Sequence, residues 1–217
     1  MNKYQKTFKI FNFKNLLKLS LLVALISCGL KGETKIILER SAKDIIDEIN
    51  KIKKDAADNN VNFAAFKEDK TGSKVSENSF ILEAKMRGTT VAEKFVTAIE
   101  GEATKLKKTG SSGEFSAMYN MMLEVSGPLE ELGVLRMTKT VTDAAEQHPT
   151  TTAEGILEIA KIMKTKLQRV HTKNYCALKR RKILLLLMKN AKITNKQHFY
   201  NQLKQYPTKS IWLGLGL

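Results

Sequence analysis

The stretch ILERSAKDIIDEINKIKKDAA, residues 37–57, decides the fold class. Its apolar side chains recur at alternating steps of four and three residues, with lysines and acids between them. This spacing places them on one face of an amphipathic helix that packs in a bundle. The residues of that face are Leu38, Ala42, Ile45, Ile49, Ile52 and Ala56.

Four further segments repeat this helical period, and no segment shows the alternation of a half-buried strand. Gly110–Gly113 breaks the chain after the second segment. Gly127–Pro128 ends or kinks the third because proline lacks an amide donor, and His148-Pro149 stops the fourth. We therefore expect an all-α protein, a five-helix bundle. The helices are expected at residues 37–57, 79–109, 115–125, 137–145 and 156–173.

The connection between the first two helices, from Val61 to Ser79, lacks helical period and is basic. It carries Lys67, Lys70 and Lys74. Ordered loops of this length are often functional. We expect a long basic loop that adapts to its ligand.

The amino terminus has the layout of a bacterial export signal, because residues 1–27 contain five lysines, an apolar run and no acid. The tetrapeptide Leu25–Cys28 then matches a lipoprotein box, in which cleavage precedes the cysteine and lipid is attached to it. A transmembrane helix over residues 16–26 is the alternative, but it falls short of the roughly 20 apolar residues that span a bilayer. We expect a signal peptide at 1–27, lipidation of Cys28 and a tether at 28–34.

The formal net charge of +15 misdescribes the mature domain. Five positive charges lie in residues 1–27 and nine in residues 176–217, and neither segment contains an acid, so residues 28–175 carry a net charge of +1. The charge therefore gives no support to nucleic-acid binding, which export also opposes. Any anion site must come from local clustering of lysines on a balanced surface.

The histidines, His148, His171 and His198, have no cysteine or carboxylate at metal-ligand spacing. The sequence also lacks the nucleophile-elbow, phosphate-loop and zinc-protease motifs. An enzyme is not expected, nor is a metal or another cofactor.

A set of cations is instead placed where a polyanion could lie. Lys166 and Lys173 are seven residues apart, hence two turns apart on one helix face and about 10.5 Å along the axis. Arg169 follows Lys166 by one turn, while Lys85 and Arg87 lie on the second helix. We predict that the three loop lysines close over a groove between the second and fifth helices. Sulfate groups would be bound by several such cations together, since one exposed contact contributes little. Solubilising surface charge is the alternative interpretation.

The export junction LISCGL (25–30) and five internal stretches form a recognisable combination. The internal stretches are ILERSAKDI (37–45), ILEAKMRGTTVAEKFV (81–96), EATKLKKTGSSGEFSAMY (102–119), MTKTV (137–141) and TTAEGILEIAKIMKTKLQRVHTKN (151–174). Together they resemble the decorin-binding protein family of spirochaetal surface lipoproteins, and the similarity extends to about residue 178.

The resemblance implies a five-helix bundle that binds the host proteoglycan decorin. Binding in the family is chiefly through the dermatan sulfate chain of decorin, and heparin-like glycosaminoglycans are also bound. Three lysines are implicated in the family, and they match Lys85, Lys166 and Lys173 here. The loop between the first two helices is also associated with glycosaminoglycan contact, which extends more loosely to the three loop lysines.

The tail, residues 176–217, departs from the family. It is basic and apolar, and we expect it to be disordered. The codons for residues 180–195 can be chosen so that the frame two bases on reads KKNPSFTDEKCKNN and then stops, which would supply a second cysteine found in some family members. We therefore hypothesise a frame change near Arg180, through mutation or sequence error, which leaves Cys176 without its partner. The intact mass of the natural protein tests this hypothesis.

The sequence thus predicts a non-enzymatic adhesin that is lipid-anchored and exposed on the bacterial outer membrane. Residues 35–175 are expected to bind decorin, dermatan sulfate and heparin-like glycosaminoglycans, and no nucleic acid. The alternative is a surface lipoprotein that recruits a host plasma factor through its helix faces.

Overall fold

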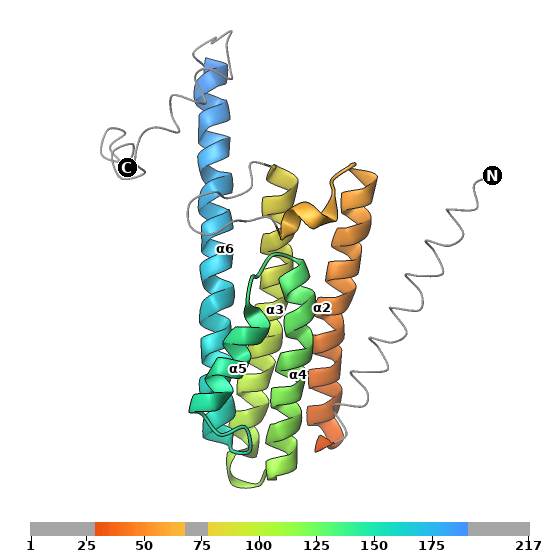
Figure 1. Cartoon of the computed structure of the whole chain (residues 1–217), viewed down its shortest axis with the longest axis vertical. Coiled ribbons are helices and arrows are strands. Elements are labelled where there is room, and N and C mark those ends of the chain that lie inside the picture. The colour runs from red at the N-terminus through yellow and green to blue at the C-terminus, as the bar shows by residue number, and fades with distance from the viewer. Residues whose placement is uncertain (1–28, 68–77, 191–217) are drawn as a thin grey trace, which may run out of the picture. The chain divides into compact units, whose positions relative to one another are not determined.

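The computed structural model describes residues 29–67 and 78–190. The chain divides into two compact units, residues 1–175 and 176–217. Five α-helices account for most of the described residues and confirm the predicted all-α, five-helix class (Figure 1). The elements are α2 (Gly32–Asp58), η2 (Phe63–Phe66), α3 (Ser79–Lys105), η3 (Leu106–Lys108), α4 (Ser112–Glu131), α5 (Met137–Gln147) and α6 (Ala153–Asn190), where η2 and η3 are short 3-10 helices.

Within the first unit the helices pack along their lengths. Helices α2, α3 and α4 lie side by side, and successive ones run in opposite directions (Figure 1). The shorter α5 packs on α4. Side chains of α6 reach two of these helices, since Lys164 donates to Glu100 of α3 and Lys166 donates to Thr140 of α5. The helix α6 therefore borders both α3 and α5.

The predicted apolar face of the first helix is confirmed, because all six of its residues are buried in α2. The predicted start of the second helix is confirmed at Ser79, whereas the third helix starts at Ser112, ahead of the predicted residue 115. Both starts carry side-chain caps. The side chain of Asn78 accepts from the amide of Phe80 at 2.9 Å at the start of α3. Ser111 and Glu114 form a capping box at the start of α4. Such caps satisfy amides that have no partner inside the helix.

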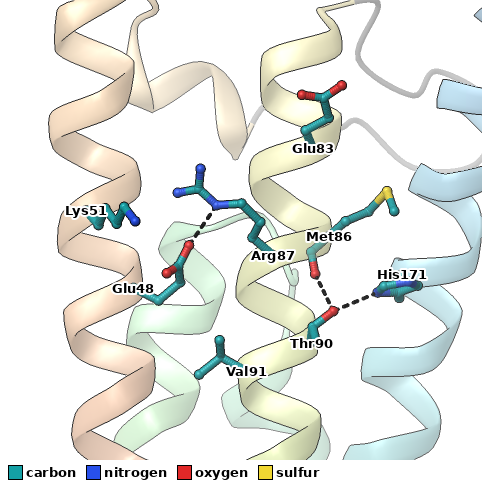
Figure 2. Close-up of a pocket in the computed structure, with 8 residues that line it drawn as sticks. All are labelled: Glu48, Lys51, Glu83, Met86, Arg87, Thr90, Val91 and His171. Carbon is teal, nitrogen blue, oxygen red and sulfur yellow. Dashed lines mark hydrogen bonds and ion pairs between the residues drawn. The ribbon is translucent and has the colours of Figure 1, made fainter.

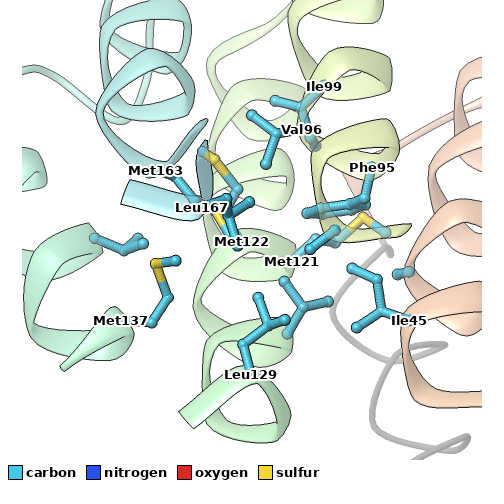
Figure 3. Close-up of a cluster of buried hydrophobic side chains, with 14 of the residues drawn as sticks. Ile45, Phe95, Val96, Ile99, Met121, Met122, Leu129, Met137, Met163 and Leu167 are labelled. Carbon is cyan, nitrogen blue, oxygen red and sulfur yellow. The ribbon is translucent and has the colours of Figure 1, made fainter. Parts of the chain in front are cut away.

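The core is rich in methionine. Figure 3 shows Met121 and Met122 of α4 in one buried cluster with Phe95 of α3, Met137 of α5 and Met163 of α6. All five side chains are fully buried. Methionine fills irregular gaps, and full burial of each such side chain stabilises the fold by about 1.5–3 kcal/mol. The apolar faces of the helices therefore converge on one core.

Of the two outcomes that Gly127–Pro128 left open for the third helix, the structure excludes an end at the proline, because the helix continues past it. Helix α4 runs to Glu131, because proline removes a single intrahelical hydrogen bond and the additional turn buries Leu129 completely. Gly133 ends the helix instead, with a φ of +94°. The amide of Val134 then donates to the carbonyl oxygen of Leu129 at 2.9 Å, as in a Schellman motif.

The fifth helix extends beyond Lys173 to Asn190. Residues 176–190, which were expected to be disordered, are therefore helical. This segment contains no glycine or proline and is rich in lysine, arginine and leucine, all of which favour helices. Its cysteine, Cys176, is free and exposed.

The signal segment, Cys28 and the tail beyond residue 190 lie outside the described residues. Their predicted roles and the frame-change hypothesis therefore stay predictions. No helix in the described part of the chain is long and apolar enough to cross a bilayer.

The connection between α2 and α3 is described as far as Lys67, and it starts with more order than we expected. Phe66 of η2 is fully buried. Its ring centroid lies 4.8 Å from that of Phe63 and 6.4 Å from that of Phe80. This aromatic cluster fixes the first part of the loop against the start of α3.

Candidate functional site

The cations of α6 fall into two groups. Toward the start of the helix, carboxylates neutralise the lysines, since Lys161 pairs with Glu158 and Lys164 with Glu100. Three cations that follow them pair with no carboxylate in residues 29–67 and 78–190. These cations, called the α6 cation row below, are Lys166, Arg169 and Lys173.

The α6 cation row lies on an unbroken helix, as expected from the sequence. Lys166 and Lys173 are seven residues apart within α6, which corresponds to about 10.5 Å along its axis. Arg169 and Lys173 are exposed, whereas Lys166 is half-buried. The structure therefore brings these three predicted site residues together on one helix.

Lys166 is held in place by the start of α5. Its ammonium donates to the carbonyl oxygen of Arg136 at 2.9 Å and to the hydroxyl of Thr140 at 2.6 Å. Burial lowers the pKa of Lys166. The carboxylates of Glu130 and Asp143 oppose this shift, and the guanidinium of Arg136 reinforces it. The charge of Lys166 is thus fixed in position and only partly compensated.

Lys85, which the sequence placed in the candidate polyanion site, is buried. Only 1% of its surface is exposed. Its side chain packs against the connection between α4 and α5, because a Cβ at Gly133 would stand 2.8 Å from its Nζ. In this conformation the side chain cannot meet a polymer on the surface.

The positive charge of Arg87 is neutralised within the fold. Its Nε donates to Glu48 at 2.8 Å, and its Nη2 donates to Asp55 at 2.9 Å. Both carboxylates belong to α2, so Arg87 links α3 to α2. Arg87 therefore has little charge to offer a ligand.

A hollow of about 560 Å³ adjoins the pair of Glu48 and Arg87 (Figure 2). Glu83 and Lys51 also line it, and His171 of α6 lies at its edge beside the hydroxyl of Thr90. Because carboxylates and cations balance here, the hollow has no preference for a polyanion. It is not the basic groove that the sequence predicted.

The loop lysines are described in part. Lys67 is exposed directly after η2. Lys70 and Lys74 lie outside the described residues, so their place relative to the α6 cation row stays a prediction.

The chemistry of the α6 cation row is that of hydrogen-bond donors and positive charge. An ammonium offers three donors and a guanidinium five. Such groups bind carboxylate, phosphate and sulfate oxygens through short, charge-assisted bonds. Among the described residues, no three or more His, Cys, Asp or Glu side chains are arranged to hold a metal ion.

A family model described as decorin binding protein matches residues 33–192, which is well over half of the chain. The chain belongs to the decorin-binding protein family. The resemblance noted in the sequence is therefore confirmed.

Relatives in the decorin-binding family match most of the chain. Decorin-binding protein A of Borreliella burgdorferi is 74% identical over 170 residues, which cover 78% of this chain and 89% of that protein. Decorin-binding protein B of the same species is 42% identical over 148 residues, which cover 68% of this chain and 79% of that protein. The structure of decorin binding protein A from strain N40 of Borrelia burgdorferi is 93% identical, covers 70% of this chain and 92% of that one, and has a TM-score of 0.62. The structure of decorin binding protein A from strain PBr of Borrelia garinii is 56% identical. It covers 70% of this chain and 94% of that one, with a TM-score of 0.52.

Sequence analysis of this decorin-binding family member missed Arg136 and Thr140. Arg136 immediately precedes the predicted start of a helix at Met137, and Thr140 lies one turn inside it. Their contact with Lys166 depends on how α5 packs against α6. Residue spacing within single helices carries no signal for such a contact.

Proposed function

We propose that this chain is a surface adhesin that binds decorin through its dermatan sulfate chain and also binds related sulfated glycosaminoglycans, including heparin-like chains. The observation that carries the proposal is the α6 cation row, in which three cations stand without a carboxylate partner in the described residues. Membership in the decorin-binding family supports decorin as the proteoglycan.

Binding of such a polymer is the sum of several weak contacts. One exposed ion pair contributes about 0–1 kcal/mol, so three cations spaced along one helix act together. The polymer also releases condensed counterions when cations approach it, by analogy with nucleic-acid phosphates. The affinity should therefore fall steeply as the salt concentration rises.

The helical core supplies the rigidity that this mechanism requires. Lys166 is already held by two hydrogen bonds, so less side-chain freedom is lost when it binds a ligand. The loop lysines Lys67, Lys70 and Lys74 would add contacts that adapt to an irregular polymer. Rigid and adaptable cations together suit a heterogeneous glycan.

Lys85 and Arg87 have a supporting role in this proposal. Lys85 packs beneath the connection that ends in Arg136, and Arg87 ties α3 to α2. A substitution of Lys85 that weakens binding would act through the position of this connection. Direct contact with the glycan is assigned to the α6 cation row.

The lipoprotein box supports attachment of the adhesin to the outer membrane through lipid on Cys28. Two or more acyl chains anchor a protein stably, whereas a single chain does so only marginally. Mass spectrometry of the amino-terminal peptide tests the lipidation. Protease digestion of intact cells tests surface exposure, because an exposed bundle would be removed and a protein inside the cell would not.

Immobilised decorin, intact and after enzymatic removal of its glycosaminoglycan chain, tests the proposed function. The protein from Gly29 onward should bind intact decorin, and the binding should be lost after digestion. Binding that survives digestion would contradict the glycan mechanism. That result would favour a protein interface, as in the alternative of a lipoprotein that recruits a host plasma factor.

A further inference from the structure

The hydrogen bonds of Lys166 leave part of its donor capacity unused. An ammonium has three N–H groups, and two of them donate to the carbonyl oxygen of Arg136 and the hydroxyl of Thr140. The same hydroxyl donates to the carbonyl oxygen of Arg136 at 2.8 Å. Lys166, Arg136 and Thr140 therefore form a closed set of contacts that fixes the ammonium and leaves one N–H for a ligand.

Arg136 adopts a backbone conformation that residues with a Cβ rarely take. Its φ and ψ are 59° and 33°, in the left-handed region. This conformation precedes α5, and the carbonyl oxygen of Arg136 accepts the amide of Thr140 at 3.0 Å as well as the ammonium of Lys166. The side chain of Arg136 is exposed. An unusual backbone at an exposed cation is the kind of feature that clusters at ligand sites.

The charges around Lys166 compensate its charge and that of Arg136 only in part. Glu130 accepts the amide of Thr138, and Asp143 pairs with Lys139 at 2.9 Å, so both nearby carboxylates are already engaged. In the described part of the chain, neither Lys166 nor Arg136 forms an ion pair. The two residues are in contact, because the ammonium of Lys166 donates to the carbonyl oxygen of Arg136 at 2.9 Å, and the positive charge of Arg136 lowers the pKa of Lys166. An anionic oxygen placed between the two would relieve this repulsion.

We infer that Lys166 and Arg136 form a two-cation subsite for one sulfate or carboxylate group of a sulfated glycan, with Thr140 as the positioning residue that fixes Lys166. The inference rests on the proposed function and deepens it. Arg136 contacts the ligand directly, whereas Thr140 acts through Lys166.

The test compares four variants on immobilised dermatan sulfate over a range of salt concentrations. Thr140→Val removes the hydroxyl while keeping the shape of the side chain, and Thr140→Ser keeps the hydroxyl. Thr142→Val is the matched control, because its hydroxyl donates only to carbonyl oxygens of its own helix. Arg136→Asn removes the charge with a residue that tolerates the left-handed conformation.

Thr140→Val should weaken binding about two- to tenfold, the range for one hydrogen bond. It should leave the slope of log affinity against log salt unchanged, because the number of cations is the same. Arg136→Asn should reduce the steepness of that slope by about one, as expected when one cation no longer meets the polyanion. Thr140→Ser and Thr142→Val should bind like the parent chain.

Thermal unfolding of each variant separates a binding effect from a folding effect. The subsite is overturned if the parent chain binds while Thr140→Val and Arg136→Asn bind equally well with the same salt slope. It is also overturned if Thr142→Val weakens binding as much as Thr140→Val. If the parent chain itself does not bind dermatan sulfate, the proposed function fails. In that case, NMR titration with a sulfated disaccharide tests the subsite alone, and resonances of Lys166 and Arg136 that do not move would overturn it.

Discussion

The side chain of Lys85 fills the space beside Gly133, where a Cβ would stand 2.8 Å from the ammonium nitrogen. Both residues are buried. The contact ties α3 to the connection between α4 and α5, residues 132–136, whose last residue holds Lys166. A lysine inside the fold is therefore linked, through this connection, to a cation on its surface.

Substitution of Lys85 should destabilise the fold. Lys85→Ala removes a large buried side chain, and comparable truncations cost about 2–5 kcal/mol. Urea unfolding should show this loss. Lys173→Ala, which removes the same charge from an exposed position, should change stability by less than about 0.5 kcal/mol. Equal stability of the two variants would show that Lys85 is not packed as described.

Gly133 should not tolerate a side chain. A Cβ there would lie 2.2 Å from the carbonyl oxygen of Phe66, and the φ of +94° is strained for any L residue. Gly133→Ala should therefore lower the unfolding temperature. Gly101→Ala is the matched control, because nothing lies within 4 Å of its Cβ position and alanine in a helix stabilises by up to about 1 kcal/mol. The account is wrong here if both variants unfold at the parent temperature or above.

Helix positions could be predicted because each helix buries one face, and the starts of α3 and α4 also carry side-chain caps. The face of residues 37–57 and the capping box of Ser111 and Glu114 are both readable from a short window. Whether Pro128 ends its helix could not be decided from the sequence, because the cost of a proline is local, whereas the burial of Leu129 depends on the whole bundle. The extension of α6 to Asn190 follows from the helix propensity of residues 176–190, which holds despite the unusual composition of the tail.

The candidate site could be predicted only in part. The seven-residue spacing of Lys166 and Lys173 is a property of one helix, so it was visible in the sequence. The burial of Lys85 and the neutralisation of Arg87 depend on neighbouring elements, which spacing does not reveal. Arg136 was missed for the same reason.

Stability should depend on pH through Glu124. Its Oε1 is buried without a hydrogen-bond partner in the described structure, and burial raises the pKa of this carboxyl to about 7. The folded state therefore binds a proton more tightly than the unfolded state, whose carboxyl has a pKa near 4.5. The contribution of Glu124 to stability is most favourable below about pH 4.5 and is lost as the pH rises through about 7.

Thermal unfolding between pH 5 and pH 8 measures this effect. Glu124→Gln stays neutral throughout, so it should unfold at a higher temperature than the parent chain at pH 8 and show a flatter dependence on pH. Glu146→Gln removes an exposed carboxylate from α5 and should keep the parent slope. If the unfolding temperature of Glu124→Gln depended on pH as steeply as that of the parent chain, the pH dependence could not be assigned to Glu124.

Arg87 should contribute little to glycan binding, because Glu48 and Asp55 already neutralise it. Arg87→Ala should change the affinity for dermatan sulfate by less than about twofold. Lys173→Ala removes a cation without such partners and should weaken binding about two- to fivefold. Surface plasmon resonance at low salt compares the two, and a larger loss for Arg87→Ala would place the glycan on α3.

The most direct test of the central claim compares two triple variants that lose the same charge. One replaces the α6 cation row, Lys166, Arg169 and Lys173, with alanine. The other replaces Lys107, Lys161 and Lys164 with alanine. These three lysines form ion pairs with Glu154, Glu158 and Glu100, respectively.

The measurement is the affinity of each variant for dermatan sulfate as a function of salt. The account predicts that the first variant loses most of its binding and most of its salt dependence, while the second keeps both. Equal losses in the two variants would mean that net charge alone drives binding, and parent-like binding by the first would remove the α6 cation row from the site.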